Sequence, residues 1–213
     1  HFKVSKKIAI SLLKMSFPFL LSNVLVVAQM NVDNILLMAL AGPRSTGIYS
    51  AAYVMMAVFF FVPVSIGASY YPRLTKAYAS ERSEFVAQSN LVYRQVVMIS
   101  ALIAVVIFAT ADWLVSLLYG SAFSDAAAIL RILAASLVFV GLVSIRTRIL
   151  AIEGQSKLIL MISAMTLIAN VVLLWLLIPS YGGLGAAIAT TLSWLLNYLL
   201  FPISQLWSKP SND

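Results

Sequence analysis

The sequence predicts an all-α integral membrane protein, folded as a bundle of six transmembrane helices. Of its 213 residues, 62% are hydrophobic and only 10% are charged, and the mean hydropathy is +0.99. Soluble domains average about 45–50% apolar and about 25% charged residues, so this composition excludes an ordinary water-soluble domain. Cysteine is absent, which excludes disulfides and cysteine chemistry.

Six apolar stretches of 21 to 24 residues are the predicted spans of this single bundle, residues 1–213. At 1.5 Å per residue each crosses about 30 Å of hydrocarbon, and none alternates as β-barrel strands do. Residues 113–120 are apolar but too short to cross, so we expect them at the membrane interface. The spans and the residues that end them are 17–40 (Gly42-Pro43), 48–71 (Pro72), 91–111 (Asp112), 126–149 (Glu153-Gly154), 158–178 (Pro179) and 184–206 (the polar tail).

The basic residues predict the orientation. Twelve of the 14 Lys and Arg lie in the amino-terminal segment or near the loops after spans two, four and six. Positive residues concentrate on the cytoplasmic side of membrane proteins, so both termini of this multi-pass chain should be cytoplasmic. This bias accounts for the net charge of +7 without a nucleic-acid partner. The chain begins with His1 and no signal-peptide pattern, so we expect it to be part of a longer protein.

Span one carries an unusual polar face. Gln29, Asp33, Asn34 and Asn23 fall within an arc of roughly 140° on a helix, with Asn31 about 60° beyond it. An ionised Asp facing lipid costs at least about 2.5–3.5 kcal/mol, so this face should point into the bundle or a wet cavity. Asp33, with Gln29, is the ion-coupling candidate, because a desolvated carboxyl takes up a proton or a cation. The three asparagines are candidates to line a substrate cavity, or else to join helices by hydrogen bonds.

Three arginines lie near the cytoplasmic ends of spans three and four: Arg94, Arg146 and Arg148. A guanidinium matches phosphate oxygens, so these residues are candidates to bind an anionic substrate in an inner cavity. The alternative is that they extend to the lipid headgroups. Arg131, near the outer end of span four, has the same two interpretations.

Two segments bear on how the helices bend and pack. Pro63 and Gly67 lie inside the second span, and proline removes a helical hydrogen bond, so they form a candidate hinge. A static kink is the alternative. The small residues between 182 and 189 are expected to let helices approach closely.

Absent residue types argue against an enzyme. The only histidine is His1, and there is no glycine-rich phosphate loop and no pair of acids within the spans. We therefore predict no catalytic residues, no metal site and no cofactor.

Several strings in order along the chain resemble those of a known family. They are FPFLL at 17–21, VDNILL at 32–37, TGIYSAA at 46–52, YPRL at 71–74, LYGSAF at 118–123 and IPSYGGLGAAIAT at 178–190. Together they resemble the second half of a bacterial polysaccharide flippase of the multidrug/oligosaccharidyl-lipid/polysaccharide exporter superfamily. This resemblance implies one lobe, the carboxy-terminal half, of a two-lobe, 12-helix exporter. Relatives often carry a basic residue in an Arg-Ile-Asp-like string, where this chain has Asn31-Val32-Asp33.

The resemblance implies a membrane transporter of the bacterial inner membrane. It would flip undecaprenyl-diphosphate-linked oligosaccharide repeat units by alternating access, driven by a proton or sodium gradient, during synthesis of surface polysaccharides such as O-antigen, lipopolysaccharide or exopolysaccharide. Its expected partners are this lipid-linked substrate, membrane lipids, a polysaccharide polymerase and a chain-length regulator. Two alternatives are a cation-coupled multidrug antiporter of the same superfamily and a non-transporting scaffold of a polysaccharide assembly complex.

Overall fold

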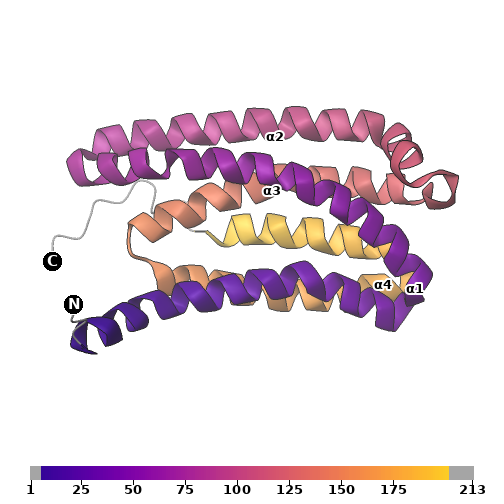
Figure 1. Cartoon of the computed structure of the whole chain (residues 1–213), viewed down its shortest axis with the longest axis horizontal. Helices are drawn as coiled ribbons and strands as arrows, with labels where there is room; N and C mark the ends of the chain where they lie inside the picture. Colours follow the sequence, from indigo (N-terminus) through magenta and orange to yellow (C-terminus); the bar gives the residue numbers. More distant parts are fainter. Residues whose placement is uncertain (1–5, 202–213) are drawn as a thin grey trace, which may run out of the picture.

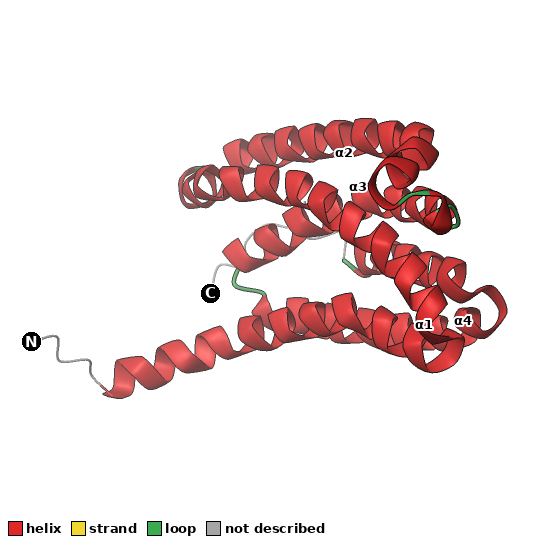
Figure 2. Ribbon diagram, turned by 45° about the vertical axis from the view of Figure 1, so that its right-hand side comes forward, coloured by secondary structure: helices red, strands yellow, loops and turns green. Residues whose placement is uncertain are grey.

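Helices make up almost all of the described chain. The computed structural model describes the backbone of residues 6–201 and the side chains of residues 16–201. Within these residues there is no strand (Figure 2). In order, the elements are α1 (Lys6–Ser80), α2 (Arg82–Tyr119), the short 3-10 helix η1 (Ser121–Phe123), α3 (Ala126–Ile152) and α4 (Ser156–Leu200).

Two of these helices fold back on themselves at a glycine. A straight helix of 75 residues, the length of α1, would extend about 110 Å. The chain instead reverses at Gly42 (φ 77°, ψ 179°), and α4 does the same at Gly182 (φ 54°, ψ −128°). Figure 1 shows the resulting hairpins, so the chain forms the predicted six-helix membrane bundle. Spans one and two are the α1 halves before and after Gly42, α2 and α3 are spans three and four, and spans five and six are the α4 halves.

The bundle has two distinct ends. The turns at Gly42 and Gly182 lie at one end with η1, which we call the reversal end (Figure 1). The turns between α1 and α2 and between α3 and α4 lie at the other end, with Arg82, Arg146 and Arg148 nearby. We call this the basic end.

Helices α1 and α2 run well beyond the predicted spans. Helix α1 begins at Lys6 and passes Pro72 to end at Ser80, while α2 includes residues 113–119 as its last turns. The extension after Pro72 buries Leu74 and Ala77 against Phe85 of α2, so packing offsets the hydrogen bond that proline removes. Residues 202–206 of the sixth predicted span lie outside the described residues.

Helix α3 is the central element. More than half of its most apolar stretch is buried (56%), against 17% for α2, and it contacts α1, α2 and α4. Its close approach to neighbours depends on Gly141, where a Cβ would lie 2.6 Å from Val96 Cγ1 and 3.0 Å from Pro63 Cβ. Helix α2 exposes apolar side chains such as Leu102 along its outer face, as expected of a helix in contact with lipid.

The small residues after Gly182 pack closely, as predicted. At Gly183 a Cβ would lie 2.8 Å from Ile129 Cδ1, so a larger residue there would force the end of the Ile129 side chain to move. Gly185 lies against the main chain of its own hairpin. A Cβ at this position would lie 2.4 Å from the Leu177 carbonyl oxygen, so the position requires glycine.

An ion pair joins two turns at the basic end. Arg82, the first residue of α2, lies 3.6 Å from Glu153, the residue after α3. Gln155 donates a hydrogen bond of 3.3 Å to the other oxygen of Glu153. Burial raises the pKa of Glu153, and the Arg82 guanidinium offsets part of that rise.

Replacing Gly42 should test the first reversal. Its backbone conformation is essentially restricted to glycine, so Gly42→Ala should lower the free energy of unfolding by about 1–3 kcal/mol. Gly47→Ala is the matched control, because Gly47 is helical and a Cβ there meets nothing within 4 Å. This variant should gain about 0.5–1 kcal/mol. Denaturant unfolding in detergent measures both, and equal effects would contradict the assigned turn.

Removing the Glu153 charge should change how stability depends on pH. Because the folded-state pKa is raised, folding favours the protonated acid. The stability gained from that proton is complete below the unfolded pKa of about 4.3 and is lost as the pH rises through the folded value. The melting temperature of Glu153→Gln relative to that of the wild type should therefore rise as the pH increases above about 4 and level off above the raised folded-state pKa. Glu84→Gln, at an exposed position of α2, is the control, and a constant difference would contradict the assignment.

Candidate functional site

Asp33 forms the centre of a buried hydrogen-bond cluster. Its side chain is 1% exposed, and one carboxylate oxygen, Oδ2, accepts two hydrogen bonds. Tyr49 Oη donates at 2.6 Å and Thr190 Oγ1 at 2.7 Å, while the two hydroxyls lie 3.3 Å apart. No Lys or Arg nitrogen of residues 16–201 lies within 4 Å of Asp33. Hydroxyl groups, rather than the basic residue of the Arg-Ile-Asp-like string, therefore stabilise this carboxyl.

The two glycine turns bring these residues together. Asp33 lies nine residues before Gly42, and Tyr49 lies seven residues after it. Thr190 follows Gly182 by eight residues. At 1.5 Å per residue, all three side chains lie roughly 10–14 Å from the reversal end. The hairpin geometry thus places groups from spans one, two and six at the same depth.

Several buried polar atoms around Asp33 have no hydrogen-bond partner. The second carboxylate oxygen, Oδ1, is one of them, and Gln29 Nε2 is another. Asn170 of span five lies near Asp33, and its side chain is fully buried. Neither of its amide atoms makes a hydrogen bond. Buried polar atoms are normally paired in native proteins, so this cluster retains acceptor and donor capacity for a proton, a cation or water.

The cluster extends toward the basic end between spans five and six. Asn197 Nδ2 donates to Thr166 Oγ1 at 3.0 Å, and Thr166 donates in turn to the carbonyl of Ile162. Thr166 lies one helical turn from Asn170, so their side chains share a face. Sequence reasoning missed Tyr49, Asn170 and Thr190. For Tyr49 and Thr190 the available signal was a distance from the glycine turns comparable to that of Asp33.

The structure divides the predicted polar arc of span one into two faces. Asp33 and Gln29 are buried inside the bundle, whereas Asn23 and Asn31 are exposed. The exposed asparagines donate to carbonyls of their own helix, at 2.9 Å and 2.7 Å. Asn34 is half-buried and accepts a hydrogen bond of 2.8 Å from Ser50 of span two. Neighbouring helices therefore cover only part of the arc: Asp33 and Gln29 point into the bundle, and the surroundings of Asn23 and Asn31 stay a prediction.

The candidate arginines have different surroundings. Arg94 is exposed and makes no hydrogen bond or ion pair with residues 16–201. Arg146 is 7% exposed, donates from Nη1 to the carbonyls of Tyr198 (2.7 Å) and Phe201 (3.2 Å), and lies 4.0 Å from the Tyr198 ring centroid. Arg146 thereby caps the end of α4 and does not lie on an exposed face of the bundle.

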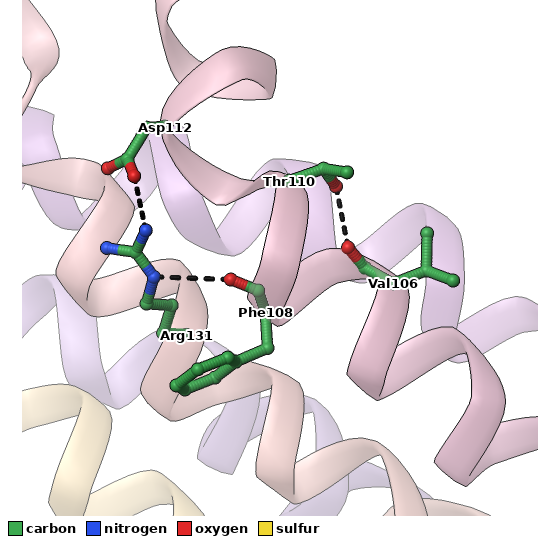
Figure 3. A network of polar contacts seen from close by, with 5 residues as sticks. All are labelled: Val106, Phe108, Thr110, Asp112 and Arg131. Carbon is green, nitrogen blue, oxygen red and sulfur yellow. Dashed lines mark hydrogen bonds and ion pairs between the residues drawn. The ribbon is translucent and has the colours of Figure 1, made fainter.

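Arg131 belongs to an ion-paired network at the reversal end (Figure 3). Its guanidinium pairs with Asp112 of α2, and its Nε donates to the carbonyl of Phe108 at 3.2 Å. The guanidinium also lies 5.8 Å from the centroid of the Phe108 ring. Arg131 therefore joins α2 to α3, and its charge already has a carboxylate partner.

A cavity of about 410 Å³ opens at the reversal end beside both glycine turns. Its lining includes Ile48, the residue before Tyr49, and the charged side chains of Arg44 and Asp125. Within the described residues there is no group of three or more His, Asp or Glu side chains that could hold a metal ion.

Comparisons with known proteins identify the family. The MatE family model matches residues 18–176. A probable low-salt glycan biosynthesis flippase, Agl15 of Haloferax volcanii, is 25% identical over 157 residues, which cover 72% of this chain and 33% of the flippase. The chain thus spans about a third of the length of this curated relative.

Solved structures share the fold. A multidrug resistance MATE family transporter of the MOP superfamily, in an outward-facing conformation, aligns with a TM-score of 0.80 at 18% identity, covering 91% of this chain and 44% of the transporter. A MOP superfamily transporter from Pyrococcus furiosus, reported for the reverse polarity of its binding pocket, aligns with the same values. A MATE structure in the bent conformation has a TM-score of 0.78 at 19% identity, covering 89% of this chain and 43% of that structure. The family match over residues 18–176 shows that this chain belongs to the MatE family, and the alignments show that it shares the fold of these solved structures.

Proposed function

We propose that the protein flips lipid-linked oligosaccharides, carried on undecaprenyl diphosphate, across the cytoplasmic membrane during polysaccharide synthesis. The observation that carries this proposal is the distribution of charge. Arginines gather at the basic end, whereas Asp33 is the one acid among the predicted spans. A diphosphate requires cationic partners, and a cationic drug would favour acids instead. The similarity to a probable glycan biosynthesis flippase supports the same substrate class.

The exposed amides of span one supply groups suited to sugars. Asn23 and Asn31 point outward from span one. Amide groups facing lipid hydrocarbon are unfavourable, so this side of span one is better placed along a wet cavity. In the proposed cycle, alternating access exposes that cavity first to the basic end, placed in the cytoplasm, and then to the reversal end.

Asp33 is the proposed coupling residue, and its partners suggest a proton as the coupling ion. The Thr190 hydroxyl has one hydrogen but two acceptors, Asp33 Oδ2 at 2.7 Å and the Ala186 carbonyl at 2.9 Å. When Asp33 is ionised, Thr190 donates to it. When Asp33 is protonated, the acid donates to Thr190, whose hydrogen turns to Ala186. The cluster therefore accommodates both states with its hydrogen bonds intact.

Removing the acid should uncouple transport. Asp33→Asn keeps the side-chain shape, so the protein should fold and insert, but gradient-driven transport should fall at least about tenfold, since the variant has no acid to protonate. Glu84→Gln removes the charge of an exposed acid of α2 outside the cluster and should retain transport. The measurement is the initial rate in proteoliposomes under an imposed pH gradient. An Asp33→Asn variant with the wild-type rate would remove Asp33 from the coupling mechanism.

The substrate class is tested with the whole protein in proteoliposomes. A fluorescent undecaprenyl-diphosphate oligosaccharide is incorporated, and an impermeant glycosidase reports how much substrate reaches the outer leaflet. We expect the protein to accelerate this exposure and to leave ethidium movement unchanged. Ethidium transport without glycan movement would favour the multidrug antiporter. If neither moves, the result would favour the non-transporting scaffold.

A further inference from the structure

Span two and α3 meet at an unusually close seam toward the basic end. Pro63 and Gly67 lie one helical turn apart on span two and are both buried. They face Gly141 and Ser144 of α3, since a Cβ on Gly141 would lie 3.0 Å from Pro63 Cβ and one on Gly67 would lie 3.4 Å from Ser144 Oγ. The main chains of the two segments therefore pack closely against each other, and the candidate hinge, Pro63 and Gly67, lies within this contact.

Arg148 holds this seam. Its Nη2 donates to the carbonyl of Val64 in span two at 3.1 Å, and its Nη1 donates to the carbonyl of Ser144 in its own helix at 2.8 Å. The guanidinium occupies the space beside Gly67, where a Cβ would lie 3.2 Å from Nη1. Pro63 lacks an amide hydrogen, so the carbonyl of Phe59, four residues earlier, loses its helical partner, and span two is weakened in the turn just before the residue that Arg148 binds.

We propose that Arg148 is a releasable clamp on span two, opened when a phosphate-type anion takes its guanidinium away from the Val64 carbonyl. Once released, the part of span two beyond Pro63 can bend away from α3. This inference rests on the proposed function in one respect: the substrate diphosphate is the anion that would open the clamp during transport.

The surroundings of Arg148 suit this role. No carboxylate of residues 16–201 lies within 4 Å of it, and its side chain is half-buried, so the charge remains accessible and without an anionic partner. Arg131 differs because it is paired with Asp112, and Arg146 differs because it is buried against Tyr198. A guanidinium binds phosphate oxygens through two parallel hydrogen bonds and gains an attraction between opposite charges that a neutral carbonyl does not offer, so an anion can compete with the Val64 carbonyl.

Hydrogen–deuterium exchange of the whole protein in nanodiscs tests the clamp directly. In Arg148→Gln, the amides of residues 64–68 should exchange about fivefold faster than in the wild type, the factor for the loss of one average hydrogen bond. Adding inorganic pyrophosphate to the wild type should accelerate the same amides and leave those of Arg148→Gln unchanged. Arg44→Gln, at an exposed arginine of the reversal end, is the control and should match the wild type.

Arg148→Lys provides a second variant if the glutamine substitution prevents folding. Lysine keeps the charge but lacks the planar fork, so this variant should also exchange faster and should respond less to pyrophosphate. Unchanged exchange at residues 64–68 in the Arg148 variants would overturn the clamp. A wild type that does not respond to pyrophosphate would overturn its release by anions. These readouts need no lipid-linked substrate, so they are independent of the outcome of the transport assay.

Discussion

The hydrogen bonds to Asp33 Oδ2 are the interaction on which the rest of the bundle depends. They join spans one, two and six at a single buried atom, and Asn170 adds span five to the same cluster. A buried charge without partners would be costly, so the helices cannot separate here unless the carboxyl is neutralised or rehydrated. The packing of these helices and the protonation of the Asp33 carboxyl are thereby linked, and a coupling site needs such a link.

Helix α3 supplies the second constraint. Gly141 of α3 allows span two to approach closely, Gly183 of span six packs against Ile129 of α3, and the arginines of α3 bind main-chain carbonyls of both neighbours. These arginines differ in burial. Arg146 is buried and fixes the end of α4, whereas Arg148 remains accessible and binds span two one residue after Pro63. In the proposed mechanism, only the second attachment is open to competition by an anion.

The sequence predicts the fold better than the site. Hydropathy and glycine turns indicate six spans, because long apolar runs have few alternatives in a membrane. Periodicity identifies Asp33 and Gln29 as a polar face but cannot say which part of the arc a neighbouring helix covers, so Asn23 and Asn31 were grouped with them. Tyr49 and Thr190 look ordinary within their spans, and only the hairpins reveal that they match Asp33 in depth. The roles of Arg146 and Arg148 could not be predicted, because the sequence does not show which main-chain carbonyls lie within reach of their guanidinium groups.

The proposed transport cycle depends on Asp33 gaining and losing a proton as the protein changes conformation. Infrared difference spectroscopy of the reconstituted protein tests this step most directly, with the carboxyl band assigned by its absence in Asp33→Asn. We expect this band to appear and disappear as an imposed pH gradient is reversed, together with shifts of the Tyr49 hydroxyl signal. A carboxyl that stays in one protonation state throughout would contradict it.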